Sequence, residues 1–302
     1  MNGNTRAKGC FGVFVALAVI CVGGIKPAHA EKCETPERIR FSLIPAGDVE
    51  RDARLYRPLF KRIEELTGRP VKVVWPSSYA SVAEGLQGGT IDIATIGPAG
   101  YVEAKRGDAR LTPFATIDKR EGHFQARGPY YHAMLVVLSG GPYSDIHTLK
   151  DARLALTDPG STSGSLLPRD QFTPTLGMPL EAYFGAVSFS GSHAKSLLAL
   201  ARGDVDAAFI ASTQLEEAHL AGKLPANKVR VLWKSKPIPY DPFVYRGQLC
   251  EPMKRQIRAA FLGETAATSL RDLLEGFKAV GFIPIEDSHY SGIRKVLTKM
   301  PK

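Results

Sequence analysis

Strand-like runs alternate with helix-like runs along most of the chain, and this alternation restricts its fold more than any other feature. Residues 39–44, 71–75 and 91–96 are β-rich. Residues 55–67 and 79–87 carry apolar side chains at helical spacing, and each run stops at glycine. A regular succession of strand and helix is typical of α/β proteins with mostly parallel sheets.

A second series of the same kind follows. Strands are expected over 133–138, 153–157, 186–190, 205–210 and 229–233, with a possible further strand over 243–246. Helices are expected after Gly164, over 193–202 and over roughly 252–278. Two α/β series predict two lobes, and the absence of a Gly/Ser linker predicts ordered crossings near 129–134 and 234–242. The first lobe then comprises residues 31–132 with 238–302 returning to it, and the second comprises 133–237.

The first thirty residues have the organisation of a signal peptide. Arg6 and Lys8 form a basic start, residues 10–24 are apolar, and "AHA" (28–30) has the small-x-small pattern of a cleavage site. The apolar run is short and glycine-rich for a membrane span. We therefore expect cleavage before Glu31 and a mature protein in the periplasm.

Charge and cysteine content narrow the partners. The net charge is +9, of which the signal region supplies three, and no long Lys/Arg run or basic stripe is present. A nucleic-acid partner is therefore not expected.

The predicted mature chain keeps two cysteines, Cys33 and Cys250, and an oxidising compartment permits them to pair. The sequence leaves open whether they form a disulfide or stay free.

The segment "DPGSTSG" (158–164) places three hydroxyls in a tight loop between a strand and a helix. Helix N-termini present free N–H groups to anions, and Ser and Thr add donors, although the same residues also serve as plain helix caps. The loop lacks the lysine of a P-loop and has Thr162 where a nucleophile elbow needs serine. A hydrolytic triad of Ser163, His193 and Asp241 is conceivable from residue types alone.

Four segments taken together resemble one family. "SSYASVAEGLQGGTIDIATIGPAGYVEA" (77–104), "DPGSTSGSLLPRD" (158–170), "SGSHAKSLLALARGDVDAAFI" (190–210) and "SKPIPYDPFVYR" (235–246) occur in the order seen in periplasmic solute-binding proteins of phosphonate, phosphite and phosphate ABC importers. The resemblance implies a type II binding-protein fold, with two α/β lobes and a ligand cleft between them. It also implies delivery of ligand to a membrane permease and its ATPase.

The same resemblance implies a ligand site. It assigns the phosphoryl oxygens to the Ser-Thr-Ser cluster, further donors to a histidine and to tyrosines of the first lobe and the crossing, and a protonated ligand oxygen to an aspartate. The positions that match are Tyr79, Tyr130, Tyr131, Ser161, Thr162, Ser163, His193 and Asp241. Either Tyr130 or Tyr131 is expected to face the ligand. Tyr101 has a weaker claim and is equally compatible with a core position.

The chain also departs from the family pattern. Aminophosphonate binders of the family have an acidic residue about twenty positions after the histidine, where this chain has Thr213. An acidic residue often follows the histidine itself, and here it is Ala194. Glu216 and Glu217 are expected on a solvated helix face. A ligand without an amine, such as phosphite, phosphate or methylphosphonate, is therefore expected.

These inferences predict an exported, monomeric, non-enzymatic binding protein for a small phosphorus oxyanion. No cofactor or metal is expected, since no H-E-x-x-H motif or Cys/His cluster occurs. Two alternatives stay open, namely a ligand sensor with the same fold and a hydrolase that uses Ser163, His193 and Asp241.

Overall fold

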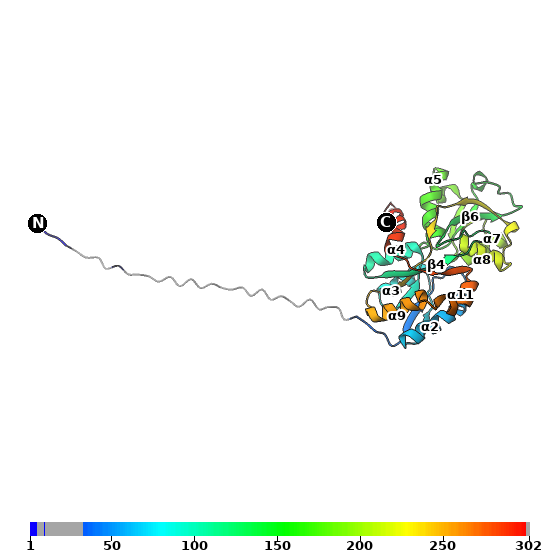
Figure 1. Cartoon of the computed structure of the whole chain (residues 1–302). Helices are drawn as coiled ribbons and strands as arrows, with labels where there is room; N and C mark the ends of the chain where they lie inside the picture. The colour runs from blue at the N-terminus through cyan, green and yellow to red at the C-terminus, as the bar shows by residue number, and fades with distance from the viewer. Residues whose placement is uncertain (5–8, 10–32, 300–302) are drawn as a thin grey trace. The chain divides into compact units, whose positions relative to one another are not determined.

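The computed structural model describes residues 1–4, 9 and 33–299, and the description below concerns 33–299. Most of the predicted signal peptide lies outside the described residues. Among these residues, no helix has the length and apolar character needed to cross a bilayer. Two sheets organise the molecule, and helices cover both faces of each (Figure 1).

The first lobe is built on a six-stranded sheet. Its order is β13(Ala279–Ile283)-β4(Thr112–Lys119)-β12(Phe243–Tyr245)-β3(Ile93–Thr95)-β1(Ile39–Ser42)-β2(Val71–Val74). The helices of this lobe are α1(Val49–Leu55), α2(Arg57–Thr67), α3(Tyr79–Gln87), α4(Pro98–Gly107), α9(Glu251–Leu262), α10(Ala266–Ser269), α11(Arg271–Gly276) and α12(Ser291–Lys299), with a 3₁₀ turn η5(Asp287–Tyr290). The blue and cyan segments of this lobe lie among the orange ones of the late chain in Figure 1.

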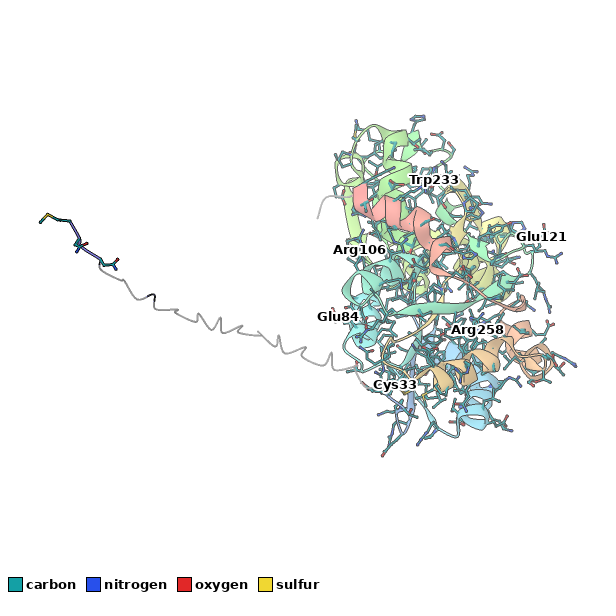
Figure 2. The ribbon with its side chains drawn as sticks, turned by 60° about the vertical axis from the view of Figure 1, so that its left-hand side comes forward. Cys33, Glu84, Arg106, Glu121, Trp233 and Arg258 are labelled. Atoms are coloured by element: carbon teal, nitrogen blue, oxygen red, sulfur yellow. A yellow bond between two sulfur atoms is a disulfide. The ribbon has the colours of Figure 1, made fainter. Side chains whose placement is uncertain are left out.

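The second lobe is built on a five-stranded sheet from one continuous stretch of chain. Its order is β10(Val229–Lys234)-β6(Ala133–Leu138)-β9(Ala207–Ala211)-β7(Arg153–Leu156)-β8(Ala186–Phe189). Its helical segments are η1(His147–Leu149), η2(Thr162–Leu166), η3(Pro168–Phe172), α5(Thr173–Leu176), α6(Leu180–Tyr183), α7(His193–Arg202), α8(Ser212–Leu220) and η4(Ala226–Lys228), of which η2 and η3 are π-helical. Trp233 lies in this lobe in Figure 2, away from Cys33, Glu84 and Arg258 of the first.

The chain crosses between the sheets twice, and the two crossings pair with each other. β5(Tyr130–Tyr131) and β11(Ile238–Pro239) form a short antiparallel ladder. Strands next to the crossings, namely β4, β6, β10 and β12, all pair antiparallel, whereas β1 with β2 and β3, and β7 with β8 and β9, are parallel. The expectation of mostly parallel sheets is therefore wrong. A strand that enters or leaves a crossing is not part of a βαβ unit, so nothing forces it to run parallel.

Alternating side chains explain how each sheet is covered on both faces. In the first lobe, Phe41 and Phe243 pack under α2 and α9, whereas Ala94 and Val244 pack under α3, α4 and α12. Helix ends follow local rules: Ser78 and Ser81 form a capping box at α3, and α7 stops at Gly203 with φ of 75°. Strong burial on both faces explains the nearly continuous apolar runs of the central strands.

A buried ion cluster and a disulfide fasten the start of the first lobe. The Asp92 carboxylate is fully buried and accepts hydrogen bonds from Arg40 at 2.7 and 2.8 Å and from Arg246 at 2.7 Å. Cys33 and Cys250 form a disulfide, which resolves the alternative that the sequence left open. The cluster joins β1, β3 and β12, and the disulfide ties residue 33 to the start of α9.

Candidate functional site

A small cavity lies between the two lobes, beside the crossings. Its volume is about 70 Å³, against roughly 300–1,000 Å³ for pockets that hold drug-sized ligands. Such a cavity suits a ligand of only a few heavy atoms. The polar residues that line it are Asp52, Tyr56, Tyr79, Thr95, Tyr131, Ser161, Thr162, Ser163, His193, Thr213, Gln214, Glu217, Tyr240 and Asp241.

The Ser-Thr-Ser cluster lies where a strand of the second lobe turns into a helical segment. Ser161 is the N-cap, and its Oγ accepts from the Gly164 N–H at 3.0 Å. Ser161, Thr162 and Ser163 are all buried, and all three line the cavity. Gly164 is required here, because a Cβ would collide with the Thr157 side chain. The capping role considered from the sequence is therefore real for Ser161, while the cluster as a whole faces the cavity.

His193 is the first residue of α7, directly after the N-cap Ser192. Its Nδ1 accepts from the Ala211 backbone N–H at 3.3 Å and lies 3.0 Å from the Thr157 hydroxyl. Since a backbone N–H only donates, the ring proton resides on Nε2, which lies 3.2 Å from Ser163 Oγ. Burial lowers the pKa of His193 to about 4, so the ring is a neutral donor at pH 7.

Two tyrosines extend the donor set. Tyr79, the first residue of α3, is 5% exposed, and its hydroxyl has no hydrogen-bond partner among the described residues. Burial raises the pKa of Tyr79, as do Asp241 and Asp158, and the nearby Ser161 hydroxyl offsets this in part. Tyr131 lines the cavity and Tyr130 does not, because successive side chains of β5 point to opposite sides. The structure therefore places Tyr131, and not Tyr130, along this cavity, and a role for either tyrosine in binding stays a prediction.

Asp241 lines the same cavity and lies between β11 and β12. Burial raises its pKa to about 7, although Lys119 acts to lower it. No hydrogen bond between Asp241 and His193 occurs within residues 33–299, where the Nδ1 of the ring is instead engaged by Thr157 and Ala211. The three residues of the conceivable hydrolytic triad thus line one cavity without forming a triad.

The expectation that Glu216 and Glu217 lie on a solvated face is wrong. Glu216 is 7% exposed and accepts from the Phe124 N–H at 2.6 Å. Glu217 lines the cavity and contacts Arg51 at 3.4 Å, which joins α8 of the second lobe to α1 of the first. The error arose because α8 packs against the crossing and α1 as well as its own sheet, which periodicity within one helix does not reveal.

Sequence reasoning also missed Asp52 and several aromatic walls of the cavity. Burial, reinforced by Glu217, raises the pKa of Asp52 to about 7, and its Oδ1 accepts no hydrogen bond from the residues that the structure describes. Tyr56, Tyr240 and Phe277 come from three distant parts of the chain. Asp52 follows the N-cap Asp48 on a short helix, so the sequence pattern indicated only an acidic residue in the first turn of a helix.

Among residues 33–299, no group of three or more metal-ligating side chains is present.

Comparison with known proteins agrees with this arrangement. Residues 41–290 match the family of ABC transporter, phosphonate, periplasmic substrate-binding proteins. The chain belongs to this family. Family membership confirms the resemblance seen in the sequence and the two-lobed fold, and it implies a periplasmic location and work with ABC transporter components.

Individual relatives cover nearly the whole chain. The phosphate-import protein PhnD of Mycolicibacterium smegmatis is 31% identical, over 93% of this chain and 91% of its own length. The binding-protein component of an ABC phosphonate transporter from Pseudomonas aeruginosa superposes with a TM-score of 0.78 at 25% identity, covering 87% of this chain and 86% of that one. PhnD1 from Prochlorococcus marinus, solved with methylphosphonate, has a TM-score of 0.75 at 20% identity, covering 88% and 98%. This last likeness is one of fold.

Proposed function

We propose that this family member captures a small phosphorus oxyanion, either phosphate, phosphite or methylphosphonate, in the cavity between its lobes. The observation that carries the proposal is the buried Tyr79 hydroxyl, which has no hydrogen-bond partner among the described residues and belongs to a side chain that lines the same cavity as the Ser-Thr-Ser cluster and His193. A buried unpaired donor is costly, and a ligand oxygen would satisfy it.

The charge of the lining supports an anion that retains a proton. In the part of the chain that the structure describes, no lysine or arginine lines this cavity, so neutral donors and the start of the η2 segment would hold the anion. Asp241, which lines the same cavity, is an acceptor for a P–OH group. Sulfate carries no such proton at neutral pH, and its negative oxygen would face the Asp241 carboxylate.

We infer that capture proceeds by closure of two lobes, residues 31–132 with 238–302 and residues 133–237, about the β5–β11 ladder. This ladder and the chain around it connect the two sheets. Ligand contacts from both sides stabilise the closed state, as differential binding requires. The inner-membrane permease and its ATPase would receive the closed protein, which acts as a monomer.

Binding without turnover is part of the proposal. The low pKa of His193 makes its ring a weak base at pH 7, and within residues 33–299 no carboxylate orients it. An activated phosphate or acyl ester should therefore release no burst of product when mixed with the protein. A burst stoichiometric with protein, lost in Ser163→Ala, would support the hydrolase instead.

The direct test is a thermal-shift screen against phosphate, phosphite, methylphosphonate, aminoethylphosphonate and sulfate. A ligand present at about 100 times its Kd adds roughly 2.7 kcal/mol to the free energy of unfolding. We expect stabilisation by the first three and none by sulfate. Ser163→Ala should weaken binding at least tenfold, whereas Ser144→Ala should leave it unchanged, because Ser144 lies on an exposed loop and its hydroxyl bonds to Asp145. Sulfate binding as tightly as phosphate would contradict the role of Asp241.

Cleavage of the predicted signal peptide can be tested separately. We propose that the mature protein begins at Glu31, after "AHA". Mass spectrometry of the periplasmic protein should give the mass of residues 31–302. A protein that keeps residues 1–30 would instead be anchored by them.

A further inference from the structure

Helix α4 of the first lobe begins without a cap from its own segment. Its N-cap residue is Gly97, which has no side chain, and its first residue is Pro98, which has no N–H. Ala99 therefore carries the first backbone donor of the helix. That donor is buried and bonds to Thr162 Oγ1 at 2.8 Å, from the opposite lobe.

The same hydroxyl has a second bond to offer. A threonine hydroxyl holds one proton and two lone pairs, and Ala99 N–H occupies one lone pair. Thr162 lines the cavity close to Tyr131, so a ligand oxygen there would take the Thr162 proton in place of the Tyr131 hydroxyl. One oxygen atom is thus placed to accept from the first lobe and donate to the anion.

We propose that Thr162 caps α4 across the cleft and thereby couples anion binding to closure of the lobes. This inference rests on the proposed function. Donation to an anionic oxygen makes Thr162 Oγ1 a better acceptor, which strengthens its bond from Ala99. The bond also turns the positive end of the α4 dipole toward the anion. When the lobes separate, Thr162 moves away from the start of α4, and the Ala99 N–H bonds to water in place of the Thr162 hydroxyl.

The backbone around this contact is built for close approach. A Cβ on Gly97 would lie 3.2 Å from Ile44 Cδ1 and 3.7 Å from Thr162 Oγ1. On the other side, a Cβ on Gly160 would lie 3.2 Å from Tyr79 Cβ. The tight contact at Gly160 is between the lobes, so a side chain there would press against Tyr79 of the first lobe. The tight contact at Gly97 is within the first lobe, and its distance to Thr162 is an ordinary one.

The test removes the donor and leaves every ligand-facing group in place. Ala99→Pro deletes the N–H in the first turn of a helix, where proline is tolerated. Its control, Ala99→Gly, weakens the helix but keeps the N–H. Spin labels at the exposed positions Lys72 and Lys223, one on each lobe, report closure by their separation, and calorimetry with methylphosphonate reports affinity.

We expect Ala99→Pro to shift the labels toward the open separation and to weaken methylphosphonate binding about tenfold, through faster dissociation at an unchanged association rate. Ala99→Gly should behave as the unmodified protein does. Closure and affinity in Ala99→Pro equal to those of Ala99→Gly would overturn the proposal.

A second pair of variants tests the same proposal without a proline substitution, so the proposal can be tested even if Ala99→Pro misfolds. Thr162→Ser keeps the hydroxyl and should keep closure, while Thr162→Val loses it and should open the ligand-free protein. Equal label separations in these two variants without ligand would also overturn the inference. This comparison needs no ligand, so it stands even if the unmodified protein binds no phosphorus oxyanion and the proposed function fails.

Discussion

Replacing Tyr79 by phenylalanine should move stability and affinity in opposite directions. The ring is 5% exposed, and the hydroxyl has no partner among the described residues. An unsatisfied buried polar group costs about 1–3 kcal/mol, so its removal should raise the free energy of unfolding of the ligand-free protein by about 1 kcal/mol. The same hydroxyl, donating to an anionic oxygen, contributes about 1.5–3 kcal/mol to binding. Loss of that bond raises the Kd roughly 10- to 150-fold.

Urea unfolding without ligand and calorimetry with methylphosphonate measure the two quantities. Tyr101→Phe is the matched control, because Tyr101 is also buried but its hydroxyl donates to Asp287 at 2.6 Å. That variant should lose about 1–2 kcal/mol of stability, since a made bond is removed, and keep its affinity. A Tyr79→Phe protein that is less stable and binds as tightly as before would refute the reasoning, because its hydroxyl would then be structural.

Three further predictions concern charged groups. Burial raises the pKa of Asp241 to about 7, above its unfolded value of about 3.9, so ligand-free stability should fall as pH rises from about 4 to 7. Asp241→Asn should reduce this fall in urea unfolding measured at several pH values; an unchanged slope would show that Asp241 stays ionised. Asp92→Ala removes the buried carboxylate from the Arg246 guanidinium, which keeps the exposed Glu34 carboxylate at 2.7 Å, and should cost about 3–5 kcal/mol in the free energy of unfolding; a loss below 1 kcal/mol would mean that the cluster is dispensable. Methylphosphonate should bind more tightly than aminoethylphosphonate, because Glu217 is paired with Arg51 and is not free to pair with the ligand's amine. Arg51→Gln should reduce the difference in affinity between the two ligands in competitive calorimetry; if aminoethylphosphonate binds the unmodified protein more tightly, Glu217 pairs with the amine even in the presence of Arg51.

The strands and helices that the sequence predicted correctly are those whose signals lie in neighbouring residues. The strands over 71–75, 133–138 and 229–233 and the helices over 79–87 and 193–202 appear close to their expected bounds. Their signals, namely apolar runs, spacing and stops at glycine, depend on neighbours in sequence. The strands β4 and β13 were not expected, since Pro113 interrupts the first and Gly281 the second, and long-range pairing to each other supports both.

The candidate site also contains residues that local sequence predicts and residues that only long-range packing brings in. The Ser-Thr-Ser loop and His193 stand out by composition and order, and the structure brings them together. Asp52 and Glu217 do not stand out, because a carboxylate on an amphipathic helix usually faces water. Their burial depends on the approach of two lobes, which is encoded by packing between residues about 165 positions apart. The choice between Tyr130 and Tyr131 likewise required the register of β5.

The position of β12 has a consequence for how the protein is made. This strand, residues 243–245, lies between β3 and β4, so the first sheet is continuous only when the late chain is present. The second sheet needs only residues 133–234. During synthesis, the N-terminal third therefore lacks a central strand until most of the polypeptide has emerged. Export through the signal peptide proposed above would benefit from this delay, because the part that enters the membrane first would be the part that cannot yet fold.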